Sequence, residues 1–405
     1  MSKFYFNLKL LFSIIFVNNA FSQQGCTDPL ANNYNINALS NNGSCTYNTT
    51  NLSILQSLPL SNTISETSGL IEWDNFLYTH NDDSNVNIYK LNKSTGDITT
   101  THNLSGVINI DWEEISQDQN NIYIGEFGNN VSGNRTNLKI YKFLKSTISN
   151  PIIETINFSY SNQTDFTAQN VNNTDFDCEA FVVTENEILL FTKQWITQKS
   201  TIYSIPKVAG THIATPLATI NVGGLITGAT YIENYNVIVL SGYNSTLSPF
   251  IYLIYDLNGL NFNQANQRKI DLNLSFHQIE SISSIDGLEY FLTNESFAYP
   301  PFIESPQKLH KISLNSFLGN YINSLNLNEY KFSNEIIFYP NPANNLLMIK
   351  NNNSIDLNYK ITNLSGQTVQ QGIFENNQIN IENLETGIYF INIIDSNQIS
   401  KIIKN

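Results

Sequence analysis

Short apolar runs of β type, separated by turns, fill the chain from residue 51 to residue 328. Runs of this kind, bounded by turn residues, are typical of β-strands. No long stretch shows the period of an amphipathic helix, so a fold of alternating strands and helices is not expected. The pattern therefore predicts an all-β domain in this region.

One local pattern recurs along this region, in the segments SETSGLIE, DWEEISQD, DCEAFVVT, ITGATYIE and QIESISSI. A second apolar run follows each segment, and a third run tends to carry an aromatic residue. Strand, turn, strand, loop and strand, repeating at roughly 45–66 residues, is the pattern of a β-propeller blade. We expect five blades, with six as the alternative because the second interval is long. NLSILQSLPL, residues 51–60, is expected to supply the missing strand of the last blade.

The last part of the chain, residues 329–405, carries a separate β pattern. Its runs alternate apolar and polar residues at period two, and LSGQ and ETG mark turns between them. This pattern predicts a small β-sandwich. Pro340 and Pro342 suit an extended segment that leads into its first strand. Gly387 is expected to let the chain turn before a tightly packed strand.

Residues 334–405 resemble the type A C-terminal sorting domain of the type IX secretion system, which is found in Bacteroidota. The segments YPNPANNLLMI, YKITNLSGQTV, LETGIYFINI and KIIKN carry the resemblance. Its motif residues here are Tyr339, Pro340, Asn341, Pro342 and Gly387. The resemblance implies passage across the outer membrane by the type IX machinery, followed by release or anchoring at the cell surface.

The N-terminus predicts export as well. Residues 1–22 have a basic start, a short apolar run and small residues before the expected cleavage point, which is typical of a secretory signal peptide. The run is too short for a membrane-spanning helix, and no later segment reaches about 18 apolar residues. We therefore expect an exported chain without a transmembrane segment.

Residues 23–50 hold two of the three cysteines. In an oxidising compartment Cys26 and Cys45 most simply pair as a disulfide. The segment 26–47 resembles a short CTDPxAxNYNP module of secreted bacterial proteins, although its usual second proline and acidic pair are replaced. A structural cap or spacer is therefore expected. Cys178 is expected to be a buried free thiol.

The region 51–328 also resembles a group of secreted bacterial propellers that carry DWEDIA and GDIGDN motifs. The segments DWEEIS, GEFGNN, DFDCEAF, FTKQW and ITGA occur here in the order of that group, across residues 111–229. No assigned activity follows from this resemblance. A likeness to calcium-dependent phytases rests on architecture alone, which is a poor guide to chemistry.

Aligning the five copies brings acidic residues of the innermost strands together on the channel axis. The predicted metal-binding residues are Asp111, Glu113, Asp177, Glu179 and Glu280, and Asp82 and Asp83 could add oxygens from the rim. Converging carboxylates repel one another unless something positive or protonated lies between them. Calcium, which takes about 6–8 oxygen ligands, is the candidate cofactor. The alternative is a solvated channel whose acids bond to backbone and water.

The second strands end at the same rim. The predicted ligand-binding residues there are Lys193, Trp195, Tyr243 and Asn294. Lys193 could face an anionic ligand or pair with Glu179. The rings of Trp195 and Tyr243 could stack on a sugar or pack against a neighbouring blade. A small molecule or a glycan is therefore the expected ligand class.

Charge and missing motifs narrow the function. The formal net charge of −14 argues against nucleic acid, because phosphate binding requires clustered Lys and Arg. GxSxG and HExxH motifs are absent, and whether the protein is an enzyme stays open. We expect a secreted or cell-surface propeller that binds a ligand or calcium at its mouth. The alternative is a calcium-dependent hydrolase of phosphate esters or glycans, which would place Lys193 and Arg135 in an open acidic mouth.

Overall fold

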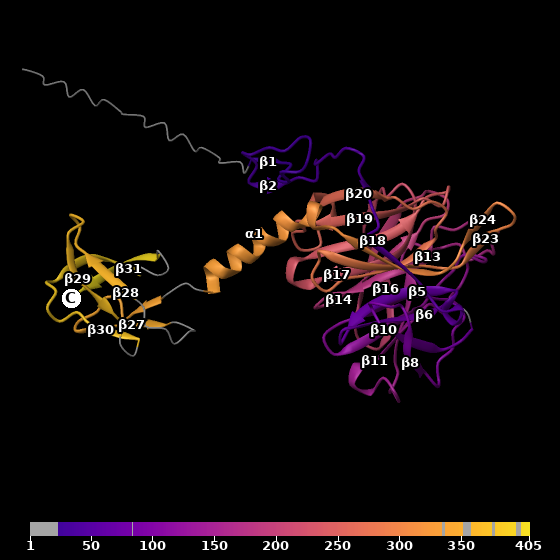
Figure 1. The fold of residues 1–405 in the computed structure, drawn as a ribbon, viewed down its shortest axis with the longest axis horizontal. Coiled ribbons are helices and arrows are strands. Elements are labelled where there is room, and N and C mark those ends of the chain that lie inside the picture. The colour runs from indigo at the N-terminus through magenta and orange to yellow at the C-terminus, as the bar shows by residue number, and fades with distance from the viewer. Residues whose placement is uncertain (1–22, 83, 334–336, 351–357, 375–376, 394–397) are drawn as a thin grey trace, which may run out of the picture. The chain divides into compact units, whose positions relative to one another are not determined.

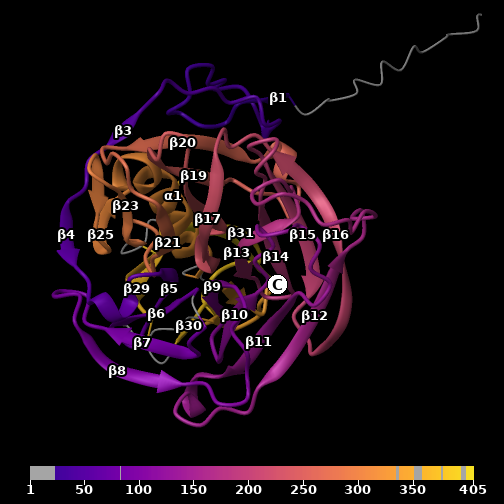
Figure 2. The ribbon, with the colours of Figure 1, turned by 90° about the vertical axis from the view of Figure 1, so that its right-hand side faces the viewer.

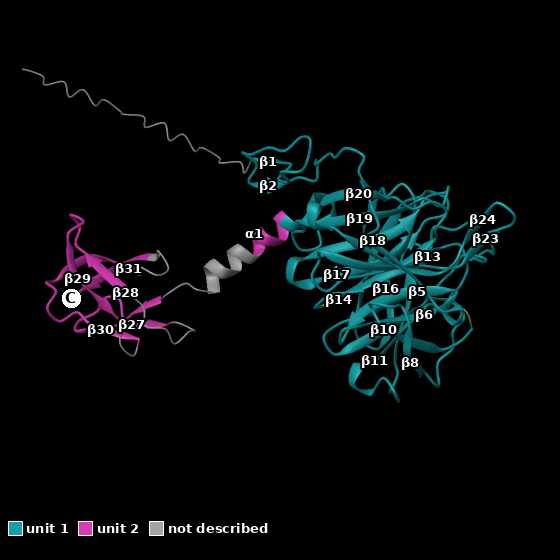
Figure 3. Ribbon diagram, viewed as in Figure 1, with its two compact units in different colours: residues 1–319 teal, residues 320–405 magenta. Residues whose placement is uncertain are grey.

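The structure, a computed structural model, describes residues 23–82, 84–333, 337–350, 358–374, 377–393 and 398–405 (Figure 1). The expected signal peptide, residues 1–22, and Asp83 lie outside this set. The chain divides into two compact units, Met1–Gly319 and Asn320–Asn405 (Figure 3). Strands make up most of the regular structure in both units, as the sequence predicts.

The main strands of the first unit form five four-stranded groups, named here blades 1 to 5. Blade 1 contains β5 (Thr67–Trp73), β6 (Phe76–Asn81), β7 (Asn87–Leu91) and β8 (Ile98–Asn103). Blade 2 contains β9 (Trp112–Gln117), β10 (Asn121–Glu126), β11 (Lys139–Leu144) and β12 (Glu154–Tyr160). Blade 3 contains β13 (Asp177–Val183), β14 (Glu187–Lys193), β15 (Ser200–Pro206) and β16 (Gly210–Ile220). Blade 4 contains β17 (Leu225–Ile232), β18 (Val237–Tyr243), β19 (Pro249–Tyr255) and β20 (Asn266–Leu272). Blade 5 contains β21 (Ile279–Ser283), β22 (Glu289–Asn294), β25 (Lys308–Ser313) and β4 (Gln56–Pro59).

The blades form a closed, propeller-like ring. The innermost strands β5, β9, β13, β17 and β21 lie beside one another in that order, and β21 returns to β5 (Figure 2). Blades 2 and 3 also join at the outside, because β12 pairs with β16 in parallel. Strand β4 pairs antiparallel with β25, so the segment before blade 1 supplies the outer strand of blade 5. This closure is the one that the sequence predicts for residues 51–60.

Short elements complete the first unit. They are β1 (Gln24–Gly25), β2 (Ser40–Asn41), β3 (Asn51–Leu52), β23 (Phe297–Tyr299), β24 (Ile303–Ser305), and the 3-10 turns η1 (Asn62–Ile64), η2 (Lys145–Thr147), η3 (Glu233–Tyr235) and η4 (Phe262–Gln264). Strand β3 pairs in parallel with β20 of blade 4. The strands β23 and β24 form a separate two-stranded sheet between β22 and β25.

The apolar core lies between neighbouring blades rather than on the axis. Between blades 2 and 3, for example, the rings of Phe127 and Phe181 meet edge to face at 5.6 Å between centroids. Cys178 is buried in the same cluster and is free, as expected. Because such aromatic side chains bury large apolar areas, each pair of blades forms its own stabilising interface.

The N-terminal segment is held by a disulfide and by contacts to blade 4. Cys26 and Cys45 are bonded, with an S–S distance of 2.04 Å. Asp28 accepts hydrogen bonds from the hydroxyls of Tyr47 and Tyr255, of which Tyr255 belongs to β19. These contacts are consistent with the expected structural cap.

One helix, α1 (Asn315–Ser333), follows blade 5 and was not predicted from the sequence. The expected boundary between residues 328 and 329 falls within it. Buried Leu314, Phe317, Leu318 and Ile322 have helical spacing, but the run is too short to stand out against the surrounding β pattern. Within the described part of the chain, no helix is long and apolar enough to cross a membrane.

The second unit is a small sandwich of two sheets, as expected. One sheet contains β26 (Ile337–Tyr339), β27 (Leu346–Lys350) and β30 (Gln378–Asn380), and the other contains β28 (Asn358–Thr362), β29 (Thr368–Ile373), β31 (Gly387–Ile393) and β32 (Gln398–Lys404). Buried Leu347 and Ile349 of β27 share one core with Ile361 and Ile391 of the other sheet. Alternation at period two produces this core, because successive side chains of a strand point to opposite faces.

Four of the predicted motif residues of the second unit, Tyr339 to Pro342, precede β27, and the fifth, Gly387, begins β31. Asn341 follows Tyr339 and Pro340, and its side chain donates to Lys401 O at 2.9 Å and accepts from Ile403 N at 2.8 Å. The motif is thereby tied to the last strand. The chain turns before β31, at residues 382–386, as expected. Gly387 itself begins β31 without a left-handed φ, and a Cβ there would reach only Tyr389, at 3.8 Å, so the turn does not depend on glycine at this position.

Candidate functional site

The predicted site residues lie at one end of the ring, named here the mouth. The innermost strands start at this end, and antiparallel pairing places the ends of the second strands beside them. Asp177 at the start of β13 pairs with Lys193 at the end of β14. In the same way Leu225 pairs with Tyr243, and Ile279 pairs with Asn294. The sequence repeats therefore converge on a single polar rim, as expected from their alignment.

Lys193 is a buried cation rather than an open anion receptor. Its Nζ lies 3.1 Å from Glu179 Oε1, and the two side chains are only 5% and 3% exposed. The same Nζ lies 4.7 Å from the ring centroid of Trp195 and 5.5 Å from that of Tyr243. Burial lowers the pKa of Lys193, but the charges of Glu179 and its neighbours outweigh burial and raise the pKa well above its usual value. Lys193 could have faced an anionic ligand or paired with Glu179, and in the structure it pairs with Glu179.

Asp177 is enclosed by donors from two loops. Trp195 Nε1 donates to Asp177 Oδ2 at 2.8 Å, and Asn129 N donates to Oδ1 at 2.5 Å. Burial, and then the charge of Glu179, raise the pKa of Asp177 well above its usual value. The indole of Trp195 is therefore engaged by Asp177 and Lys193. Of the two alternatives for this ring, stacking on a sugar or packing within the protein, these contacts favour the second.

Asp111 and Glu113 lie against the backbone of Gly128. A Cβ built on Gly128 would lie 2.1 Å from Glu113 Oε1 and 2.3 Å from Asp111 Oδ2, so only glycine fits there without displacing the carboxyl groups. Burial and the charge of Asp177 raise the pKa of Asp111 to about 6. Burial, and then the charge of Glu179, raise the pKa of Glu113 well above its usual value. Both groups therefore bind protons more readily than a solvated carboxylate.

Arg135, the second base near the mouth, is also paired. Its guanidinium forms an ion pair with Glu126, the last residue of β10, and donates to Gly128 O at 2.6 Å. Glu126 in turn accepts from the backbone N–H of Ile110 at 2.8 Å. Arg135 therefore organises the loop around Gly128 and carries no charge that is open to a ligand.

A carboxylate triad that the sequence alignment did not single out lies at the same mouth, between blades 1 and 5. Glu66, Asp82 and Glu295 each offer a carboxylate oxygen, and these oxygens lie within 4.8 Å of one another. Glu66 precedes β5, Asp82 follows β6, and Glu295 follows β22. Glu66 and Glu295 were missed because they lie just outside the aligned strand positions, although SETSG and LTNES place them beside the repeats.

The carboxyl groups of the triad and its neighbour Glu280 are close enough to shift one another's pKa values. Burial, together with the charge of Glu66, raises the pKa of Glu295 from 4.5 to about 7, although Lys193 acts in the opposite direction. Burial and the charges of Glu295, Glu179 and Asp82 likewise raise the pKa of Glu280 well above its usual value, against Lys193. Glu280 is thus the predicted residue that links the triad electrostatically to the rest of the mouth.

The two remaining predicted ligand residues are held by protein groups. Asn294 is buried, its Nδ2 donates to Pro306 O at 3.0 Å, and its Oδ1 lies 2.8 Å from His310 Nε2. The hydroxyl of Tyr243 lies 3.4 Å from Gln278 Nε2, and the side chain is buried. Both side chains are therefore buried parts of the rim that contact protein groups.

Comparisons with known proteins bear mainly on the second unit. Residues 337–405 match the family described as the secretion system C-terminal sorting domain. No curated protein sequence matches the chain. Among solved structures, the chain is similar to PorZ, a surface component of the type IX secretion system of Porphyromonas gingivalis, with 12% identity and a TM-score of 0.31. The match covers 85% of this chain and 47% of PorZ, so the chain spans about half the length of PorZ.

Two enzymes are similar at the same distant level. Glutaminyl cyclase of Myxococcus xanthus matches with 11% identity over 65% of this chain and 97% of the enzyme, at a TM-score of 0.37. An exo-β-1,3-galactanase from Clostridium thermocellum matches with 12% identity over 84% of this chain and 81% of the enzyme, at a TM-score of 0.41. Likenesses this distant carry no argument about activity. The C-terminal match does identify its segment: residues 337–405 are a type IX C-terminal sorting domain, which implies interaction with the type IX machinery and export of the protein to the cell surface or the extracellular space.

Proposed function

We propose that the exported propeller-like unit is a binding protein that holds a divalent cation, calcium above all, at its mouth. The observation that carries the proposal is the convergence of carboxylate oxygens from Glu66, Asp82 and Glu295 within 4.8 Å of one another. A set of ligands that are all oxygens suits calcium, which accepts about 6–8 oxygens in variable geometry. Zinc prefers nitrogen and sulfur ligands as well, which this triad does not provide.

The charge balance around the triad supports the same proposal. Lys193 is committed to Glu179, at 3.1 Å. Burial and the charge of Glu295 raise the pKa of Glu280, and burial and the charge of Glu66 raise that of Glu295, in both cases against Lys193. Buried carboxylates in this state gain stability from either protons or a cation. At neutral pH a calcium ion would supply that charge, and Glu280, which is coupled electrostatically to Glu295 and Asp82, is a candidate for a further ligand.

The placement of the bases favours a binding protein over the calcium-dependent hydrolase. A hydrolase of phosphate esters needs cations that face an open mouth and stabilise the charge of the phosphate. Lys193 is instead buried against Glu179, and Arg135, which is half-buried, forms an ion pair with Glu126. Neither base is placed for that work, which leaves cation binding as the better-supported function.

Thermal unfolding with excess calcium and with chelator tests the proposal. Calcium that binds only the folded state should stabilise it by about 2.7 kcal/mol at a hundred times its dissociation constant. The double variant Glu66→Gln/Glu295→Gln should lose that shift while its chelated form melts no earlier than the chelated wild type, because repulsion is removed. Glu154→Gln, which changes an exposed acid of β12, is the matched control and should keep the shift. Identical melting of the wild type in calcium and chelator would contradict the proposal.

A further inference from the structure

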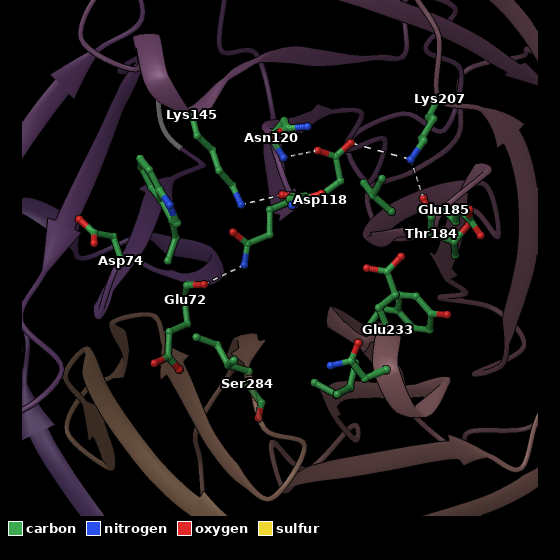
Figure 4. Close-up of a pocket in the computed structure, with 18 residues that line it drawn as sticks. Glu72, Asp74, Asp118, Asn120, Lys145, Thr184, Glu185, Lys207, Glu233 and Ser284 are labelled. Carbon is green, nitrogen blue, oxygen red and sulfur yellow. Dashed lines mark hydrogen bonds and ion pairs between the residues drawn. The ribbon is translucent and has the colours of Figure 1, made fainter. Parts of the chain in front are cut away.

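A second site lies at the end of the ring opposite the mouth, where no function has yet been placed. A pocket of about 540 Å³ opens there (Figure 4). Glu72, Gln117, Val183, Ile232 and Ser284, one from each blade, line it at or just beyond the ends of the innermost strands. The pocket is therefore on the ring's axis. Its volume is within the range of about 300–1,000 Å³ that is typical of small-molecule sites.

Blades 2 and 3 supply two ammonium groups to this pocket. Lys145 Nζ donates to Asp118 O at 2.6 Å, and Lys207 Nζ donates to Thr184 O at 2.9 Å. An ammonium has three N–H donors, so neither hydrogen bond uses up its lysine. Lys207 also lies 3.9 Å from Asp118 Oδ2, whose carboxylate already accepts from Tyr123 OH at 2.7 Å. Spare positive donors therefore line this part of the wall.

Blades 3 and 4 supply carboxylates without a cation. Glu185 and Glu233 are exposed pocket residues, and neither forms an ion pair with any residue that the structure describes. Figure 4 shows Glu233 on the side of the pocket away from Lys145. Glu185 lies beside Lys207 in the same view, so the wall carries both ammonium donors and carboxylate acceptors.

Two further lining residues favour a charged, donor-bearing ligand over a neutral sugar. Gln117 Nε2 donates to Glu72 O at 2.8 Å, while its buried Oε1 has no partner among the described residues and can accept a hydrogen bond. The ring of Trp73 is already contacted by Tyr78, at 5.2 Å between centroids, and by Lys145 Nζ at 5.8 Å. The contacts of Trp73 therefore leave less of its ring face for a sugar to stack on.

We propose that this pocket binds a small zwitterion, in particular a short peptide with free termini. Its carboxylate would lie against Lys145 and Lys207, and its ammonium against Glu233 and Glu185. Charge-assisted hydrogen bonds of this kind are stronger than neutral ones and fix the direction in which the peptide lies. The proposal does not depend on calcium at the mouth, which is at the other end of the ring.

Calorimetric titration of the full chain tests the proposal with three forms of one peptide and one sugar. Trialanine should bind at least tenfold more tightly than N-acetyl-trialanine, which lacks the ammonium, and than trialanine amide, which lacks the carboxylate. Maltotriose should not bind. Adding chelator should leave all of these results unchanged, which separates this site from the mouth. Absence of heat with millimolar trialanine, or equal binding of the capped peptides or of maltotriose, would overturn the proposal.

Two single variants locate the binding site. Glu233→Gln should remove the preference for trialanine over N-acetyl-trialanine and keep its preference over the amide, whereas Lys207→Gln should do the reverse. Both side chains are at the surface of the pocket, so the variants should melt with the wild type. Glu154→Gln should behave as the wild type. Unchanged preferences in both variants would show that the peptide binds elsewhere and would refute the assignment.

Discussion

At the mouth of the ring, Glu113 and Glu179 are almost completely buried and share one buried cation, Lys193, whereas at the opposite end Glu185 and Glu233 are exposed beside an open pocket. The same kind of side chain therefore meets two different environments in one fold. Burial at the mouth penalises the charged form, so those carboxyl groups need a proton or a cation. Exposed carboxylates at the other end face solvent and can meet a ligand. The comparison indicates that position along the strand, rather than residue type, sets the chemistry.

Removing one lysine from each end of the ring should give the largest difference in the free energy of unfolding. Lys193→Met leaves Glu179 buried without its partner, and breaking a buried pair in this way costs about 3–5 kcal/mol in the free energy of unfolding. Lys207→Met, at the pocket, should cost less than about 1 kcal/mol because that pair is partly exposed. Urea unfolding in chelator measures both. Similar losses for the two variants would remove the distinction between the ends.

Adding one methyl group at the mouth should have the next largest effect. Gly128→Ala would place a Cβ 2.1 Å from Glu113 Oε1, so the carboxyl groups must move. Overpacking of this kind costs about 1–3 kcal/mol. Gly387→Ala is the control, because its Cβ would meet only Tyr389 at 3.8 Å. Its unit should unfold as in the wild type, and a tolerated Gly128→Ala would show that the mouth is loosely packed.

Stability without calcium should depend on pH in a direction set by the mouth. The pKa of Glu295 is raised to about 7 and that of Asp111 to about 6, in both cases by burial and then by a neighbouring carboxylate, although Lys193 opposes the first shift and Arg135 the second. The folded protein therefore binds more protons than the unfolded chain between about pH 4 and pH 7, and the free energy of unfolding falls as the pH rises through that window. Each group contributes a slope of at most about 1.4 kcal/mol per pH unit.

Urea unfolding at a series of pH values in chelator measures this slope. Glu295→Gln should flatten the upper part of the profile, near pH 7, and Glu185→Gln at the other end should leave the profile unchanged. A wild-type free energy of unfolding that instead rises from pH 5 to pH 8 would contradict the account of the mouth.

The smallest effect is expected from the pocket. Glu233→Gln should change the free energy of unfolding by less than about 0.5 kcal/mol, because an exposed side chain without an ion pair among the described residues contributes little. Urea unfolding of this variant beside the wild type measures the change. A loss of more than about 1 kcal/mol would mean that Glu233 has a structural role at this end of the ring.

The sequence carries the ring and the sorting domain more clearly than the details of either site. Period-two runs and repeated segments predicted the strands, and NLSILQSLPL predicted the pairing of β4 with β25. Glu179 was recognised from its place on an innermost strand, and Lys193 from its place at the end of a second strand. The same two positions meet at the mouth in the folded ring, where the two side chains form an ion pair. Positions within strands can be predicted in this way because the repeats and their alternation fix which residues of each blade are equivalent.

The residues that the sequence did not reveal lie where the repeats break. Glu66 and Glu295 lie just outside the ends of β5 and β22. The alternation of a strand does not extend to these positions, so the sequence does not indicate where their side chains point. Lys145, Lys207 and Glu233 come from loops or turns of different blades, and nothing in their spacing relates them before the ring closes. Trp195 was identified as a rim aromatic, but only the folded chain shows that its N–H donates to Asp177. Contacts between loops that are distant in the sequence therefore could not be predicted from sequence patterns.

The most direct test of calcium binding at the mouth is a calorimetric titration of the wild-type chain with calcium at pH 8 and at pH 6. We expect binding at pH 8 and weaker binding at pH 6, because Glu295, whose pKa is about 7, must release its proton before it can coordinate the ion. Glu66→Gln/Glu295→Gln should abolish the heat at both values. No calcium binding at pH 8, or an affinity that is the same at both pH values, would contradict the account.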